Sequence, residues 1–278
     1  MNRIVCLLIL SFIGLVPTID AQVNRKKSLS TNDFAAWKVV DNPTISSDGR
    51  YAAFEINPQK GDGNLVVKTT DGKKEDLLPR GYSPSFSPES DFIVYKIKQP
   101  ADSVRIAKKK KLKKEQMPKD SIGILVFKQH KIFTYPNLKQ YALPKENARW
   151  VAFLSDLPKE KKKDENTDEN KKSPANKDDS SADSKYQLIL LNPSTGDTVK
   201  FQNITEFFYA PLGRTISFIR QVKDSVDRAE VIAFNTETSQ TNVIFRQNGT
   251  AKKITSDQQG NRLGFVFSAD TIKEKTYH

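Results

Sequence analysis

The sequence predicts an all-β protein, a partial β-propeller of about five four-stranded blades that carries charged loop insertions. Its apolar residues fall into short runs of strong β formers, bounded by Gly, Asn, Asp and Pro. A turn of the Ser-x-Asp-Gly type recurs along the chain, and its first interval of 41 residues matches the period of propeller blades, roughly 40 to 45 residues. The 278 residues are enough to bury a sizeable core.

Residues 1–21 have the pattern of a secretory signal peptide. Arg3 precedes an apolar run over residues 4–16, and a small-residue site ends at Ala21, after which we expect cleavage. Spanning a membrane needs roughly 20 apolar residues, so we expect no stable membrane anchor after cleavage. An uncleaved anchor is the alternative. Cys6 lies near the start of the run, which disfavours lipidation at its end.

The composition of the mature chain points to a bacterial periplasm. Cys6 is the only cysteine, so disulfides and thiolate metal sites are excluded after cleavage. The formal charge of +12 raises nucleic acid as a partner. However, much of this charge lies between Val104 and Lys119, where eight basic residues face Glu115 alone. Because export also separates the chain from most nucleic acid, we expect no nucleic acid partner.

An N-terminal segment over residues 22–41 precedes the blades, which we expect to occupy 42–278. Thr31 or Asn32 could cap a short helix from Thr31 to Val40. Phe34, Trp37 and Val40 would then share one face of that helix.

The repeat is clearest where residues 42–54 align with residues 82–95. In both stretches a strand ends near a serine, a turn follows, and the next strand leaves with aromatic and small residues, ending in Phe54 and Tyr95. Weaker copies end in Phe153, Phe218 and Phe265. The successive intervals are 41, 58, 65 and 47 residues, and the two long ones contain the charged segments.

A second hairpin recurs between these copies, which gives four strands per unit. We place it at residues 66–73, 132–139, 190–197 and 233–240. A generic β-sandwich or barrel remains the alternative fold, since Asp-Gly turns occur in all such proteins.

Two charged segments, at about 99–120 and 158–185, interrupt the β-like sequence, and we interpret both as loop insertions. The second has eight lysines, eight acidic residues and no aromatic residue. It cannot bury enough apolar surface to offset the entropy of ordering, so we expect it to be disordered.

The blade pattern, the signal peptide, Phe34-Ala35-Ala36-Trp37 and the Lys-rich run ending at residues 117–121 together resemble a known family. They look like the N-terminal propeller of exported prolyl oligopeptidase / dipeptidyl aminopeptidase family serine peptidases of Bacteroides-type bacteria. In that family the propeller precedes a hydrolase domain that supplies Ser, Asp and His, and it limits which peptides reach them. The resemblance therefore implies a gating or positioning role toward peptide substrates.

The sequence contains no catalytic machinery that we recognise, so we expect the chain alone not to be an enzyme. No Gly-x-Ser-x-Gly nucleophile elbow occurs, and only His130 and His278 could serve as a base. We assign no catalytic, cofactor-binding or metal-binding residues and no cofactor. About five unit signals without a closing strand would leave open blade edges, which favours self-association.

The remaining candidates favour plain structural interpretations. The Lys108–Lys114 run has no interleaved aromatics and is interpreted as a solvated loop tip. His130 lies at a strand end or turn, and Trp37 and Trp150 are expected in the core or between blades. The acidic residues at 164–169 lack the pattern of a calcium loop. A stand-alone periplasmic propeller that binds a ligand or protein, or a β-sandwich adhesion domain, remains an alternative.

Overall fold

The computed structural model describes residues 37–157, 186–223 and 226–270, together with residues 28, 30, 33 and 34. The chain divides into two units, Met1–Ala36 and Trp37–His278, and every described strand belongs to the second. The predicted signal peptide, its cleavage site, the 158–185 segment and His278 lie outside the described residues.

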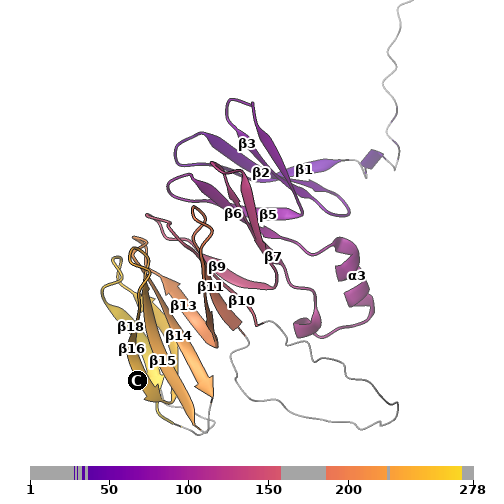
Figure 1. The fold of residues 1–278 in the computed structure, drawn as a ribbon. Coiled ribbons are helices and arrows are strands. Elements are labelled where there is room, and N and C mark those ends of the chain that lie inside the picture. Colours follow the sequence, from indigo (N-terminus) through magenta and orange to yellow (C-terminus); the bar gives the residue numbers. More distant parts are fainter. Residues whose placement is uncertain are drawn as a thin grey trace, which may run out of the picture. The chain divides into compact units, whose positions relative to one another are not determined.

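Five antiparallel sheets follow one another along the second unit (Figure 1). Blade 1 contains β1 (Lys38–Ile45), β2 (Tyr51–Pro58), β3 (Asn64–Thr69) and β4 (Glu75–Pro79). Blade 2 contains β5 (Gly81–Phe86), β6 (Phe92–Ile97), β7 (Ser121–Val126) and β8 (Lys131–Tyr135). Blade 3 contains β9 (Leu138–Ala142), β10 (Val151–Asp156), β11 (Tyr186–Leu191) and β12 (Thr198–Gln202). Blade 4 contains β13 (Ile204–Tyr209), β14 (Thr215–Lys223), β15 (Asp227–Asn235) and β16 (Thr241–Asn248).

The last sheet, which we call the half-blade, pairs β17 (Thr250–Ser256) with β18 (Leu263–Ser268). Two helical elements, α3 (Ala101–Lys109) and the 3-10 helix η1 (Lys114–Gln116), lie between β6 and β7. In blades 1–4 each strand pairs with its sequence neighbours, so every blade is a four-stranded meander. The all-β propeller fold is therefore confirmed, with one difference: the fifth unit has two strands within the described residues.

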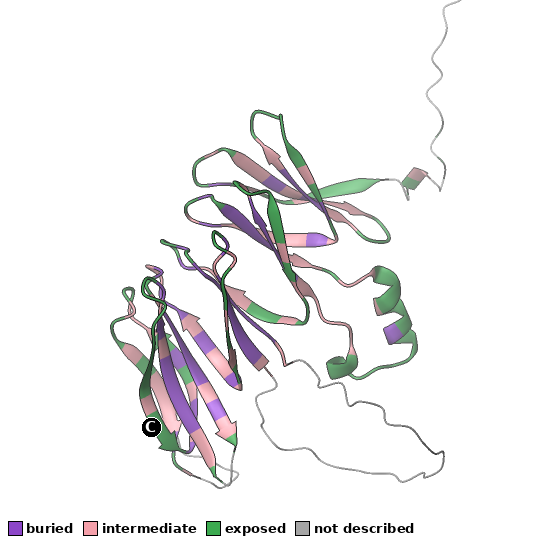
Figure 2. Ribbon diagram, viewed as in Figure 1, coloured by how far each residue is buried: buried purple, intermediate pink, exposed green. Residues whose placement is uncertain are grey.

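The central strands of blades 2–4 are largely buried on both faces (Figure 2). In blade 1, by contrast, β2 has only Ala53 and Glu55 buried. Strand β6 shows the reason: Ile93 and Tyr95 pack into the core shared with blade 1, whereas Phe92 and Val94 pack into the core shared with blade 3. Because side chains alternate along a strand, a continuous apolar run can serve two interfaces at once.

Trp150 belongs to the core between blades 3 and 4, as the sequence predicts. It is 3% exposed, its ring meets Phe234 edge-on at 5.3 Å, and its Nε1 donates to the carbonyl oxygen of Thr236 at 3.0 Å. Trp37 differs, because its side chain is 49% exposed. Lys38–Val40, expected at the end of a helix, instead belong to β1, whereas Asp33 and Phe34 are helical.

The predicted hairpin at residues 132–139 is wrong. Its two halves lie in β8 and β9, which belong to different blades. The turn between β7 and β8 lies at residues 127–130, and His130 there has a positive φ of 50°. The segment Tyr135–Leu138 is a tight connection between blades, whose Pro136-Asn137 pair has the turn chemistry of a hairpin.

The meander gives the propeller two distinct ends. The turns β1–β2 and β3–β4, with their counterparts in later blades, lie at what we call the turn end. The connections β2–β3, β6–β7, β10–β11 and β14–β15, with the links between blades, lie at what we call the insertion end. Residues 99–120 and 158–185 fall at β6–β7 and β10–β11, so both charged insertions start and finish at the insertion end.

The turn end is closed by local hydrogen bonds. In the β1–β2 turn, Asp48 accepts from the Arg50 amide at 2.9 Å and from the Ser46 hydroxyl at 2.7 Å, which lowers the pKa of Asp48 to about 2. Gly49 supplies the positive φ of 72° that the turn needs. The Asp48 amide also donates to Ser90 of the next blade at 3.3 Å. Such turns fix the hairpins that the sequence predicts.

Candidate functional site

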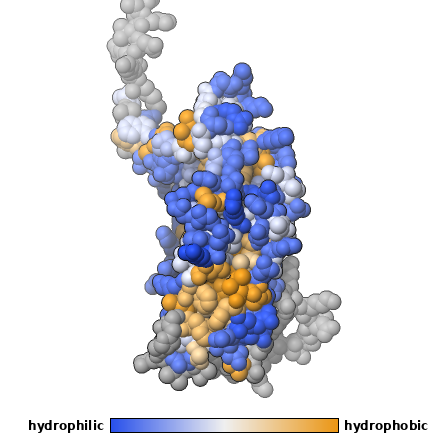
Figure 3. Space-filling view, turned by 90° about the vertical axis from the view of Figure 1, so that its left-hand side faces the viewer, coloured by the Kyte–Doolittle hydropathy of each residue, from blue (hydrophilic) through white to orange (hydrophobic). Residues whose placement is uncertain are grey.

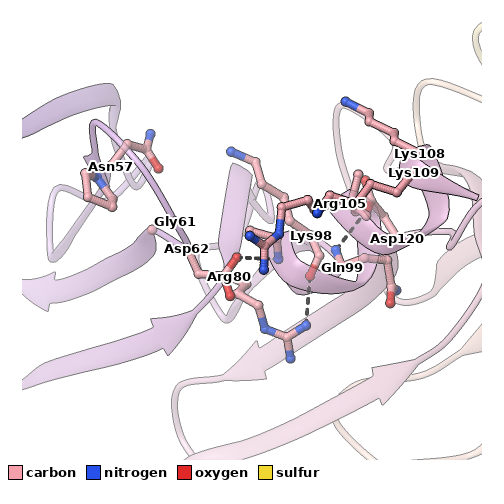
Figure 4. Close-up of a pocket in the computed structure, with 14 residues that line it drawn as sticks. Asn57, Gly61, Asp62, Arg80, Lys98, Gln99, Arg105, Lys108, Lys109 and Asp120 are labelled. Atoms are coloured by element: carbon pink, nitrogen blue, oxygen red, sulfur yellow. Dashed lines mark hydrogen bonds between the residues drawn. The ribbon is translucent and has the colours of Figure 1, made fainter.

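The candidate site is an open cavity of about 970 Å³ at the insertion end of blades 1 and 2 (Figure 4). The β2–β3 loop, the start of β5, the end of β6 and helix α3 form its walls. Its lining is Asn57, Pro58, Gly61, Asp62, Gly63, Arg80, Lys98, Gln99, Ala101, Val104, Arg105, Lys108, Lys109 and Asp120. Five of these residues are cationic and two are anionic.

Helix α3 was not predicted, because the 99–120 segment was interpreted as a loop insertion. Asp102 and Arg105 form an i,i+3 ion pair at 2.9 Å, which stabilises the helix. Lys108 and Lys109 lie in the last turn, where positive charge interacts favourably with the helix dipole. Only Ala107 is buried, at 4% exposure. The apolar stripe is therefore too narrow to be recognised in the sequence.

One hydrogen bond connects the beginning of α3 to blade 1. The Asp62 carboxylate in the β2–β3 loop accepts from the Ala101 amide at 3.0 Å. This contact satisfies one of the free amides of the first helical turn. Together with acidic Asp102, it fills the position where a helix would otherwise attract an anion.

The strand register brings Arg80 and Lys98 together on the floor of the cavity. Gly81 pairs with Ile97 across β5 and β6, so the residues just outside each strand face one another. The Lys98 amide donates to the Arg80 carbonyl, and the Arg80 Nη1 donates to the Lys98 carbonyl, both at 2.9 Å. No described residue lies within ion-pair distance of the Lys98, Lys108 or Lys109 ammonium groups.

Asp120 fixes the return from the insertion into blade 2. Its carboxylate accepts from the Tyr82 hydroxyl at 2.6 Å and from the Gln99 amide at 3.3 Å. Burial, the bond to Asp120 and the Asp120 charge raise the pKa of Tyr82. Next to it, Lys119 pairs with Asp156 of blade 3 at 2.7 Å. The base of the first insertion is thereby anchored to two blades.

A buried carboxylate lies behind the cavity wall. Glu55 of β2 is 3% exposed and accepts from the Asn42 side chain at 2.7 Å and the Ser83 amide of blade 2 at 2.9 Å. Burial opposes its ionisation, but the hydrogen bonds from Ser83, Asn42 and Asn57 outweigh burial, so the pKa of Glu55 lies below its ordinary value. Glu55 therefore links blades 1 and 2 as an anion.

Blade 4 places a second buried carboxylate at the insertion end. Glu230 is 1% exposed and receives Arg220 Nε at 2.6 Å and Arg246 Nε at 2.8 Å, with Arg228 Nε at 3.6 Å. Three guanidinium groups compensate one buried charge, which is the condition for keeping such a charge folded.

A smaller cavity, of about 260 Å³, lies at the turn end between blades 2, 3 and 4. Arg149, Glu237 and the β13–β14 turn contribute to its lining. Just outside the lining, the Lys145 and Glu146 amides donate to the Pro211 carbonyl oxygen.

The other candidate residues of the sequence do not gather at a site. Of the Lys108–Lys114 run, only Lys108 and Lys109 line the cavity. His130 lies 3.2 Å from Asp76 at the turn end, and the described part of the chain holds no cluster of three potential metal ligands. No helix of that part is long and apolar enough to cross a membrane. The acidic residues at 164–169 lie outside the described residues.

No protein-family model and no curated protein matches the chain. Among solved structures it is similar to Pyrococcus horikoshii acylaminoacyl peptidase, with TM-score 0.42 and 10% identity over 84% of this chain and 36% of that chain. It is also similar to the β-propeller domain of the Trilobed protease from Pyrococcus furiosus, with TM-score 0.40 and 7% identity over 87% and 71%. The chain thus spans just over a third of the acylaminoacyl peptidase.

A structure described as a eukaryotic initiation factor is equally similar, with TM-score 0.44 and 12% identity over 90% of this chain and 53% of that one. Peptidases and a protein of a different class therefore match at the same level.

Proposed function

We propose that this chain is the non-catalytic propeller region of a prolyl oligopeptidase-family peptidase. Its role would be to gate or position peptide substrates for a serine peptidase domain that carries the elbow serine. The support for the peptidase is the resemblance of the sequence to that family.

The observation that carries the proposal is the difference between the two ends of the propeller. Both charged insertions, the basic cavity and the buried carboxylates Glu55 and Glu230 belong to the insertion end. Variation concentrated on one end of a rigid repeat is typical of loops that contact a ligand or partner. We therefore propose that the insertion end faces the peptide substrate.

The test is to read the coding sequence beyond the codon for His278, express what it encodes, and assay a labelled proline-containing peptide. An in-frame Gly-x-Ser-x-Gly elbow, hydrolysis by the longer product and no hydrolysis by residues 22–278 alone would support the proposal. A stop codon with no hydrolase downstream would contradict the peptidase role. Hydrolysis by the shorter chain would contradict its non-catalytic character.

The alternative is a stand-alone periplasmic propeller that binds a ligand or protein. One observation favours it: every residue that lines the cavity belongs to blade 1, to the link between blades 1 and 2, or to the β6–β7 connection of blade 2. A binding module needs no second domain, so tight ligand binding by a chain whose gene ends at His278 would select this alternative.

We also propose export to a bacterial periplasm, with cleavage after Ala21. The support is the sequence of residues 1–21. Intact mass of the periplasmic product is the measurement: a mature chain that begins at Gln22 is expected, and a chain that retains Met1 in the membrane fraction would contradict export in soluble form.

Self-association is the remaining proposal about partners. Hydrophobic surface gathers over β16 and the half-blade (Figure 3), where Val243 and Ile244 are 46% and 55% exposed. In the described residues β18 pairs on one side only, so its other edge offers free backbone groups. Light scattering should show dimers that Val266→Lys on β18 disperses; a monomer at all concentrations would contradict this.

A further inference from the structure

The charges that line the basic cavity indicate which class of ligand it would bind. Arg80, Lys98, Arg105, Lys108 and Lys109 line it against Asp62 and Asp120. Because Asp102 pairs with Arg105 at 2.9 Å, the excess is two positive charges. Lys108 and Lys109 are exposed on α3, and Arg80 is half-buried. Such an excess in a concave surface attracts anionic ligands more strongly than the same charges on a flat face.

The cavity is poorly suited to a single phosphate group. Phosphate sites use free backbone amides at a helix N-terminus or in a glycine-rich loop. Here the Ala101 amide donates to Asp62 at 3.0 Å, and Asp102 places a second carboxylate in the first turn. An anion at that helix end would therefore meet like charge.

The cations are instead spread along the cavity. Arg80 and Lys98 lie at the paired ends of β5 and β6, whereas Arg105, Lys108 and Lys109 lie one and two turns along α3. A ligand that contacts both groups must carry separated negative charges. The volume of about 970 Å³ is at the upper end for a small-molecule site and has room for several residues of peptide.

We propose that this cavity binds acidic peptide segments, with spaced Asp or Glu carboxylates paired to Arg80 and Lys98 at one end and to Lys108 and Lys109 at the other. Arg80 contributes a planar fork that matches a carboxylate. As a statement about substrates, this inference rests on the proposed function; as a statement about binding, it concerns this chain alone.

The experiment measures fluorescence anisotropy of a labelled, end-blocked hexaglutamate peptide with the full mature chain at low and physiological salt. The variants are Lys108→Gln/Lys109→Gln, Arg80→Gln and Lys98→Gln. Each should weaken binding by about tenfold, and added salt should weaken the wild-type complex. Thermal unfolding of every variant checks that the fold is retained. If Arg80→Gln does not fold, Lys98→Gln tests the same end of the cavity.

The matched control is Lys110→Gln/Lys111→Gln, which removes the same charge from the same segment without touching the cavity lining. It should keep affinity within about twofold, because only long-range attraction is lost. Equal losses in both double variants would overturn the proposal and indicate diffuse attraction. Absence of binding at low salt would overturn it as well.

Two competitors separate other anionic ligands. Tripolyphosphate is the first competitor. If it displaces the labelled peptide at a lower concentration than unlabelled hexaglutamate does, the cavity prefers a phosphate ligand and the proposal is overturned. Preferential binding to vesicles containing phosphatidylserine would assign the cavity to a membrane surface, with the same consequence. Cleavage of a neutral proline peptide by a longer gene product, with no hexaglutamate binding, would overturn this inference and leave the proposed function intact.

Discussion

The turn end and the insertion end are built from the same four meanders, yet they differ in what their connections do. At the turn end, short loops such as Ser46–Arg50 close on themselves and on the neighbouring blade. At the insertion end, the equivalent connections vary from the short β2–β3 loop to the helix-bearing segment between β6 and β7. The described turn-end loops are short, whereas the insertion-end connections differ in length, and the longest described one lines the basic cavity.

Trp150→Ala is expected to have the largest effect, and it acts at the turn end of blades 3 and 4. The change removes a buried ring that packs against Phe234 and a hydrogen bond to Thr236. Unfolding by denaturant should show a loss of about 3 to 5 kcal/mol. Trp150→Phe keeps a ring and should lose less, near 1 to 2 kcal/mol. Equal stability of Trp150→Ala and wild type would contradict the inter-blade core.

Glu55→Gln tests whether the insertion end also carries buried structural charge. Because the folded pKa of Glu55 is lowered, its ionised form stabilises the fold above its ordinary value of 4.5, and this contribution is lost as pH falls below that value. The variant should lose about 1 to 3 kcal/mol at pH 7 and approach wild type in acid.

The control for Glu55→Gln is Glu75→Gln, a carboxylate that faces solvent at the start of β4 and lies 3.8 Å from Lys68. Its effect should stay below about 1 kcal/mol at every pH. A Glu55→Gln deficit that grows in acid would show that Glu55 is bound in its neutral form.

Replacing residues 100–117 by a short Gly-Ser linker should separate stability from binding. Helix α3 buries only Ala107, so the change in unfolding free energy should be under about 1 kcal/mol. Hexaglutamate binding should be lost, because the replacement removes Arg105, Lys108 and Lys109. Collapse of the fold in this variant, judged by circular dichroism and thermal unfolding, would show that the insertion is structural.

The smallest expected effect is that of Lys73→Gln/Lys74→Gln at the turn end. Both lysines lie in the β3–β4 turn, and Lys73 pairs with Asp71 at 3.1 Å on the surface. Stability and hexaglutamate affinity should both stay close to wild type, within about 1 kcal/mol and twofold. A large loss of affinity would break the distinction between the two ends.

Local chemistry explains why the blades were predictable. A few adjacent residues determine turns such as Ser46–Arg50 and the apolar run of β6. The same local chemistry led to the wrong prediction of a hairpin at residues 132–139, because the tight connection between two blades there contains residues that are typical of a hairpin turn. Which strands pair depends on packing between blades, and turn residues do not encode it.

The cavity could not be predicted for a related reason. Arg80 and Lys98 are isolated basic residues in the sequence, and only the register of β5 and β6 sets them face to face. The lysine run could be recognised in the sequence. Only the helix shows which of its members line the cavity, namely Lys108 and Lys109 but not Lys110 and Lys111. Pairing register and helix phase are therefore the missing information.

Hydrogen exchange of the mature chain with and without hexaglutamate shows which end of the propeller binds the ligand. If the insertion end is the functional end, we expect added protection in residues 57–63 and 98–109, with residues 46–50, 192–197 and 235–240 at the turn end unchanged. Protection confined to the turn end, or spread evenly over both ends, would contradict it.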